Sequence, residues 1–194
     1  MRNAELQDQE LVSLYIQGNE SCLEDLITRH KKRVFSYIMM IVRDRHLAED
    51  VFQDTFIKVI QTLKRGTYND EGKFLPWVLR IAHNLIIDHF RRVKRMPVVN
   101  GGDDFDIFSI LTLSQVNAED KLTKRQIRSD VRKAIENLPI EQREVLIMRY
   151  YIDMSFKEIA DTTNCSINTA LGRMRYALIN LKKMLEKQDI ALSA

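Results

Sequence analysis

Glycine and proline are scarce in this sequence, with 6 Gly and 3 Pro among 194 residues. Because both residues mark turns and interrupt regular elements, their scarcity predicts long elements joined by short connections. Apolar residues recur at helical spacing, and the strict alternation of a half-buried strand is hard to find. We therefore predict an all-α protein, and its length allows two small helical domains joined by a linker.

Long apolar runs and cysteine motifs are also missing. The longest apolar run, residues 34–42, is interrupted by Ser36 and is far shorter than the roughly 20 residues of a membrane span. The N-terminus has no apolar export signal, so we expect a cytoplasmic protein without membrane insertion. Cys22 and Cys165 have neither CxxC spacing nor a nearby ligand cluster, which predicts two reduced thiols.

The residues that carry catalysis or hold a metal do not form a recognisable set. No Gly-rich phosphate loop or nucleophile–base pair appears in the sequence. His83 and His89 are six residues apart, whereas metal ligands on one helix are usually separated by three or four. We therefore expect no catalytic residues, no metal and no cofactor, and a protein that is not an enzyme.

Charge is unevenly distributed, although the net charge is only +3. Four of the five residues 91–95 are basic, whereas residues 96–120 contain five acids and no lysine or arginine. This segregation predicts basic surfaces for a polyanion, separated by a segment that avoids or imitates one. We place an N-terminal domain at residues 1–95, an acidic linker at 96–123 and a C-terminal domain at 124–194.

The apolar periodicity predicts eight helices. They cover about residues 9–17, 21–42, 47–63, 76–95, 128–137, 141–150, 155–162 and 167–187. Ser21 and Glu24 have the spacing of a capping box at the start of the second helix, and Pro76 suits the first turn of the fourth.

The C-terminal domain contains the strongest local motif, a predicted helix-turn-helix. Ser155 and Glu158 form a second capping box, and Ala160 is small where one helix must approach the next. Asn164 follows at the tight turn, where its tolerance of the left-handed conformation is useful, and Ser166 caps the next helix. In such a motif the second helix enters the major groove of DNA.

The second helix of this motif supplies the first set of candidate DNA contacts. They are Ser166, Asn168, Thr169, Arg173 and Arg175. Arginine pairs with guanine edges or neutralises phosphates. The alternative is a helical hairpin with a solvated basic face.

The fourth predicted helix has a basic stripe next to its apolar face. Arg80, Asn84, Ile87, Arg91 and Arg95 follow one another at steps of four, three, four and four. Together with Arg92, this stripe suits a DNA backbone and an exposed base. Trp77 on the same helix is either a core residue or a stacking platform.

Three segments resemble the extracytoplasmic-function sigma factors of bacterial RNA polymerase, in the same order and at the same spacing. They are residues 46–60 (HLAEDVFQDTFIKVI), 74–92 (FLPWVLRIAHNLIIDHFRR) and 138–160 (LPIEQREVLIMRYYIDMSFKEIA). The resemblance implies two helical domains similar to sigma regions 2 and 4. It also implies three kinds of partner: the β′ and β subunits of core polymerase, promoter DNA and an anti-sigma factor.

The resemblance assigns roles to individual positions. Glu49, Asp50, Gln53 and Asp54 lie on a helix that resembles the one docking on the β′ coiled coil. Asn84 matches a position that holds a base flipped from the minus-ten element, and residues 167–179 match the reader of the minus-thirty-five element. The acidic linker resembles one that threads through the polymerase.

The sequence departs from the family at Gly172. Many members have a basic residue followed by Ser-Arg in the recognition helix, where this chain has Leu171, Gly172 and Arg173. Glycine inside a helix costs roughly 1 kcal/mol relative to alanine, and it permits a close approach of the backbone to DNA. The main alternative function is a dimeric helix-turn-helix repressor or activator, which leaves the acidic helix and the Asn84 stripe unexplained.

Overall fold

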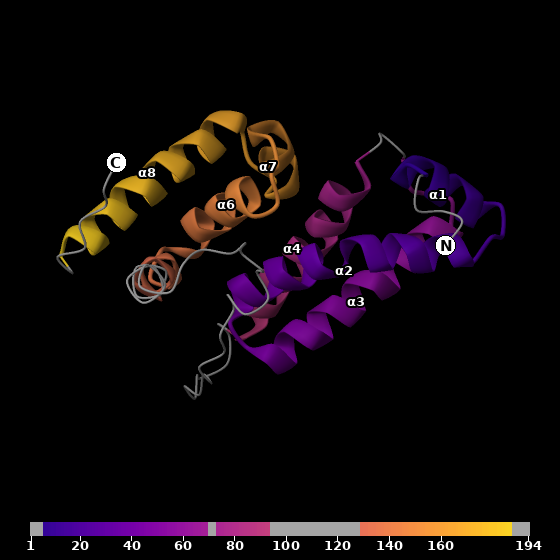
Figure 1. Cartoon of the computed structure of the whole chain (residues 1–194), viewed down its shortest axis with the longest axis horizontal. Helices are drawn as coiled ribbons and strands as arrows, with labels where there is room; N and C mark the ends of the chain where they lie inside the picture. The colour runs from indigo at the N-terminus through magenta and orange to yellow at the C-terminus, as the bar shows by residue number, and fades with distance from the viewer. Residues whose placement is uncertain (1–5, 70–72, 94–128, 188–194) are drawn as a thin grey trace, which may run out of the picture. The chain divides into compact units, whose positions relative to one another are not determined.

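The computed structural model describes residues 6–69, 73–93 and 129–187 (Figure 1). Within these ranges every regular element is helical, which confirms the predicted fold class. The chain divides into two compact units. The first contains α1 to α4, and the second contains α6, residues 156–160 of α7, and α8.

The first unit is a helical bundle built around its second helix. Its members are α1 (Asp8–Ile16), α2 (Ser21–Val42), α3 (Arg45–Lys64) and α4 (Phe74–Val93). Helix α2 packs against α1, α3 and α4, and α3 also packs against α4; Figure 1 shows α2 and α3 running side by side.

The core of this unit consists of apolar side chains at helical spacing. Val34, Ile38 and Ile41 of α2 are nearly inaccessible to solvent, as are Val59 of α3 and Val78 of α4. Burying one such side chain contributes about 1.5–3 kcal/mol. On α2 these buried residues recur at helical spacing in the sequence.

The predicted capping box at Ser21 and Glu24 is wrong. The N-cap of α2 is Glu20, and the Ser21 hydroxyl donates to the side-chain oxygen of Asn19 at 2.8 Å. Backbone carbonyls of the preceding turn satisfy the first helical donors instead: Cys22 N–H donates to Asn19 O, and Leu23 N–H donates to Glu20 O. The tight turn before α2 makes a side-chain cap unnecessary.

The other helices of the first unit start within two residues of their predicted positions. Helix α3 begins after Asp44, whose carboxylate accepts from Leu47 N–H at 2.9 Å as a side-chain N-cap. Helix α4 begins at Phe74, so Pro76 lies in its first turn as predicted. The predicted end of that helix at Arg95 lies outside the described residues.

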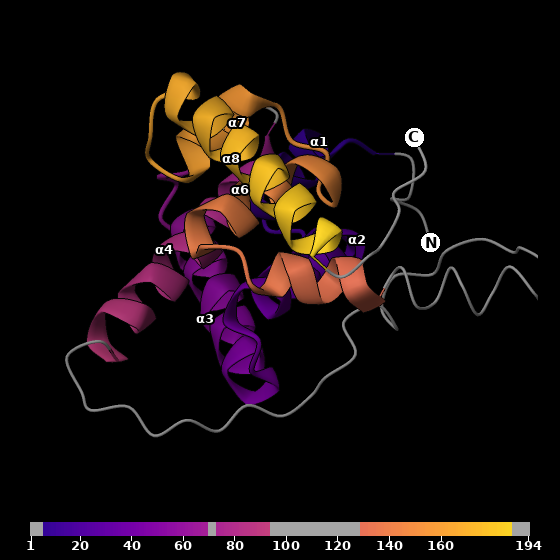
Figure 2. The same cartoon turned by 90° about the vertical axis from the view of Figure 1, so that its left-hand side faces the viewer.

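The second unit is a smaller helical domain. Residues 129–136 are helical, and α6 (Ile140–Tyr150), α7 (Phe156–Thr162) and α8 (Ile167–Glu186) follow. Helices α6 and α8 pack on each other (Figure 2), with Leu138, Leu146 and Ala177 at the centre of their cluster. The predicted linker, residues 96–123, lies outside the described residues.

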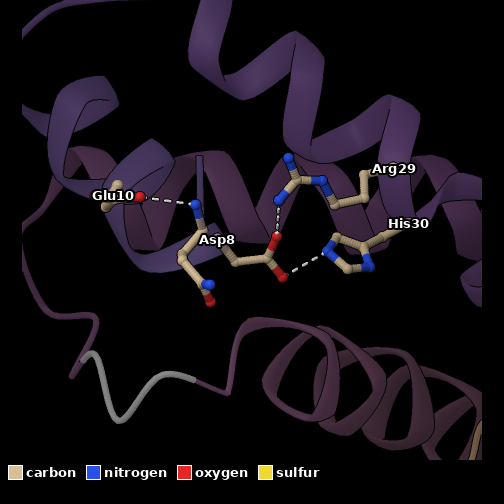
Figure 3. A network of polar contacts seen from close by, with 5 residues as sticks. Asp8, Glu10, Arg29 and His30 are labelled. Atoms are coloured by element: carbon tan, nitrogen blue, oxygen red, sulfur yellow. Dashed lines mark hydrogen bonds and ion pairs between the residues drawn. The ribbon is translucent and has the colours of Figure 1, made fainter. Parts of the chain in front are cut away.

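A polar network attaches α1 to α2 (Figure 3). Asp8, the first residue of α1, accepts from Arg29 at 2.6 Å and lies 2.7 Å from Nε2 of His30. The His30 ring is buried and contacts the ring of Phe74, with 5.6 Å between centroids. At the same helix start, the Glu10 carboxylate accepts from Gln7 N–H at 2.8 Å. The sequence gives no sign of this network, because Asp8 is 21 and 22 positions away from Arg29 and His30.

The network determines the ionisation of Asp8. Burial alone raises the pKa of this carboxyl, but hydrogen bonds and charge from His30 and Arg29 outweigh it, so the pKa lies below its usual value. A lowered pKa means that the folded state binds a proton less readily than the unfolded state. The stabilisation by Asp8 is therefore complete above the pKa of an unfolded aspartate, about 3.9, and is lost as the pH falls through the folded-state pKa.

We predict that Asp8→Asn lowers the free energy of unfolding by about 1–2 kcal/mol at pH 7, between the values for an exposed ion pair and for charged hydrogen bonds. The variant should also lose less stability than the wild type between pH 5 and pH 2. Urea unfolding followed by circular dichroism measures both. Asp50→Asn, which changes an exposed carboxylate, is the control. Parallel acid profiles for Asp8→Asn and wild type would contradict the prediction.

Candidate polymerase and nucleic-acid interfaces

The acidic residues of α3 form an exposed face opposite the packed one. Asp50, Gln53 and Asp54 are exposed and share one side of the helix, since they are separated by three and four positions. Within the described part of the chain, these three side chains make no hydrogen bond or ion pair. The face is therefore available to a partner with basic groups.

Glu49 differs from the other acidic residues of this face. It is half-buried, and its carboxylate accepts from Arg45 Nε at 2.9 Å across one helical turn. Ile57, which the sequence analysis missed, lies on the same side as Asp50 and Asp54 and is 50% exposed. The face thus combines negative charge with an accessible apolar side chain.

Helix α4 separates its apolar and polar residues in the same way. Val78, Ala82 and Ile86 are buried, whereas Arg80 and Asn84 are exposed one turn apart. Among the described residues, the Asn84 amide has no hydrogen-bond partner, so both its donor and its acceptor can serve a ligand.

The basic end of α4 includes Arg91 and Arg92 in its last turn, and both are exposed. Arg91 lies 3.7 Å from the carboxylate of Asp88, and both side chains are largely in solvent. Such an exposed pair is weak, so Arg91 remains available to a phosphate. Arg95 lies outside the described residues.

Trp77 belongs to an aromatic cluster at the start of α4. Its ring centroid lies 4.4 Å from that of Tyr68 and 5.8 Å from that of Phe74. Phe74 is buried, and Trp77 is half-buried. These contacts favour the structural role for Trp77 over that of an isolated stacking platform.

The helix-turn-helix formed by α7 and α8 has the predicted local geometry. Ser155 and Glu158 form a capping box: the Ser155 N–H donates to the Glu158 carboxylate at 2.8 Å, and the Ser155 hydroxyl accepts from Glu158 N–H at 3.3 Å. Asn164 adopts the left-handed conformation with φ 51°. Cys165 N–H donates to Ala160 O at 3.0 Å, which closes the end of α7 as in a Schellman motif.

The start of α8 is also as predicted. The Ser166 hydroxyl accepts from Thr169 N–H at 3.1 Å and lies 2.8 Å from the Thr169 hydroxyl. Ala170 and Met174 are buried against the rest of the unit. The first turn of α8 contains no acid, so the positive end of the helix dipole is not compensated there and favours an anion.

The candidate DNA contacts of α8 differ in their surroundings. Asn168 and Arg175 are exposed, and Arg173 is half-buried. Ser166 and Thr169 are exposed, but their hydroxyls already bond to each other at the cap. The structure therefore brings all five predicted residues to the first three turns of one helix and leaves three of them without a role in the cap.

The described residues contain no group of three or more His, Cys, Asp or Glu side chains that could hold a metal ion. Cys22 is buried and Cys165 half-buried, and neither forms a disulfide bond within the described residues. No helix within the described ranges combines the length and the hydropathy needed to cross a lipid bilayer.

Family models match both units. The sequence matches sigma-70 region 2 over residues 26–96 and sigma-70 region 4 over residues 128–177. The first segment contains α3, α4 and most of α2, and the second contains α6, α7 and the first half of α8. Together the two segments cover more than half of the chain.

Relatives and solved structures agree with these matches. The chain is 27% identical over 184 residues to the RNA polymerase sigma-H factor of Pseudomonas aeruginosa, covering 93% of this chain and 94% of that protein. It is 25% identical over 173 residues to the ECF RNA polymerase sigma factor SigW of Bacillus subtilis, with 87% and 91% coverage.

Two structures share the fold. One is the sigma factor RpoE of Bartonella quintana, solved with the anti-sigma factor NepR (TM-score 0.66, 19% identity, 84% of this chain and 96% of that chain). The other is CnrH, solved with the cytosolic domain of CnrY (TM-score 0.64, 20% identity, 93% and 98%). The two matched regions, their order and their relatives show that this chain belongs to the extracytoplasmic-function sigma factors of RNA polymerase.

Proposed function

We propose that this sigma factor uses three helix faces, each of which binds a different partner surface. The exposed side of α3 binds core polymerase, the polar side of α4 binds the minus-ten element, and α8 reads the minus-thirty-five element. The observation that carries the proposal is the capped helix-turn-helix, whose second helix leaves Asn168, Arg173 and Arg175 for DNA. We further propose the boundaries 1–95, 96–123 and 124–194 for the first domain, the acidic linker and the second domain.

The α3 face suits a basic protein partner. Asp50 and Asp54 provide negative charge without internal partners among the described residues, and Gln53 between them adds a hydrogen-bonding amide. The corresponding helix of the family docks on the coiled coil of the β′ subunit. Glu49 is also proposed to bind core polymerase, because its exposed ion pair with Arg45 is weak and can be exchanged for a basic group of the partner.

The α4 face suits a single strand of DNA. Arg80, Arg91 and Arg92 supply cations for the sugar–phosphate backbone, and Asn84 presents a free amide between them. The Watson–Crick edge of a base can bond to this amide only after the base has left the duplex, and extrusion costs a few kcal/mol. We propose that Asn84 offsets part of this cost and so promotes opening of the promoter.

The remaining partners follow from the family. The linker, with its acidic residues, is proposed to thread through the polymerase, whose β′ and β subunits are both proposed partners. One solved relative is in complex with an anti-sigma factor and the other with the cytosolic domain of CnrY. We propose that an anti-sigma protein also binds this chain. We place its action in the cytoplasm, where polymerase and chromosome are found, and assign it no enzymatic activity. No relative reported above supports the alternative of a dimeric repressor or activator.

Charge reversal on α3 tests the polymerase dock. Asp50→Lys with Asp54→Lys should weaken binding to core polymerase by about tenfold or more, because two favourable contacts become repulsive. Helical content by circular dichroism should not change. Glu24→Lys, an exposed reversal on α2, is the matched control. Unchanged affinity for core polymerase in the double variant would remove α3 from the interface.

Alanine variants of α8 test upstream recognition. If Arg173 or Arg175 reads a base, its loss costs about 1–3 kcal/mol and relaxes preference at one position. If it binds phosphate, its loss weakens all sequences alike and lowers the salt slope by about 1. Lys182→Ala, farther along the helix, is the control. The assignment of α8 fails if neither arginine variant changes promoter binding or sequence preference.

Asn84→Ala tests promoter opening. We expect nearly normal folding and polymerase binding, because the amide is exposed and makes no bond within the described residues. Open-complex formation on duplex promoter should fall, and a pre-melted bubble template should restore much of the lost transcription. Permanganate footprinting measures the unpaired thymines. Wild-type footprints for the variant on duplex DNA would eliminate the flipping role.

A further inference from the structure

Gly172 occupies a helix interior where the fold gives no reason for glycine. It lies in the second turn of α8, and glycine weakens a helix interior relative to alanine. Gly18 and Gly66 have positive φ angles of 103° and 66°, which explain their identity, but Gly172 does not. A Cβ atom added at Gly172 would meet no other heavy atom within 4 Å. Neither the backbone nor the packing of this unit therefore requires the missing side chain.

The surroundings of Gly172 point to an external reason. Ala170 and Met174, two positions away on either side, are buried, so Gly172 faces away from the core. One turn before it is the exposed Asn168, and one turn after it is Tyr176, which is 61% exposed. At Gly172, in the middle of the helix face that we assign to DNA, no side chain therefore projects from the helix.

We propose that Gly172 is the point of closest approach between α8 and the major groove, and that its missing side chain sets how deeply the helix enters. This inference rests on the proposed role of α8 as the upstream reader. An added Cβ would stand between the helix backbone and the base edges. The short Asn168 side chain, one turn away, reaches base edges only if the backbone lies close to them, whereas the longer Arg175 is less sensitive to depth.

The backbone N–H of Gly172 is not available as a hydrogen-bond donor to a base, because residues inside a helix donate to the carbonyl four positions earlier. Its contribution is steric: Gly172 is a positioning residue that acts through Asn168. A larger residue should therefore stabilise the protein and weaken its recognition of DNA. These two effects have opposite signs, which separates the inference from a purely structural role.

The experiment uses Gly172→Ala and Gly172→Leu, both better helix formers than glycine. Holoenzyme is assembled from core polymerase and the full chain. The probe is the promoter duplex that wild-type holoenzyme selects from a library randomised over the upstream element. We expect about fivefold greater hydrogen-exchange protection of α8 amides in the alanine variant. Promoter affinity should fall about tenfold for alanine and further for leucine, with an unchanged salt slope because no charge changes.

Two controls separate this inference from the proposed function. Glu186→Ala, at the far end of α8, should bind like wild type, and Arg173→Ala and Arg175→Ala report whether α8 reads DNA. If the arginine variants lose affinity but Gly172→Ala binds as well as wild type, the inference is wrong and the proposed function stands. If no variant loses affinity, both are wrong. If Gly172→Ala loses affinity together with exchange protection, glycine serves the fold, and the inference is again wrong.

Discussion

Burial of one apolar stripe on each helix determines which residues remain for partners. In the first unit α2 lies between three neighbours, and α3 and α4 each turn their apolar side toward it and toward each other. Val59 on α3 and Val78 on α4 are fully buried for this reason. The opposite sides, with Asp54 and Asn84, are left in solvent, so the surfaces proposed for function are a consequence of core packing.

This relation explains why so much could be predicted from the sequence. The apolar residues of such a stripe recur at helical spacing in the sequence, and the residues between them face outward. Asp50 and Asp54, which are four positions apart and outside the apolar stripe of α3, share one exposed face for this reason. The turn at Asn164 was predictable for a different reason: it depends on the intrinsic preference of one residue and on caps at fixed spacing, which are local properties.

The misses share a physical cause. Ser21 and Glu24 have the spacing of a capping box, but the turn at Asn19 and Glu20 supplies backbone carbonyls first. The contact of Asp8 with His30 joins residues whose separation in sequence follows no period. Ile57 was overlooked because a single exposed apolar residue is common on protein surfaces and becomes informative only with its neighbours. In each case, the deciding interaction depends on how the chain is packed in space.

The faces that we propose for function on α3 and α4 differ in charge, which suits their proposed partners. An acidic surface next to DNA would repel phosphates, and a basic surface on a basic partner would weaken docking. Because α3 and α4 pack on each other through their apolar sides, their polar sides point away from the shared contact. Asp54 and Arg80 can then face different partners without neutralising each other. The packing of the core thus keeps apart the two faces that we propose for a protein and for a nucleic acid.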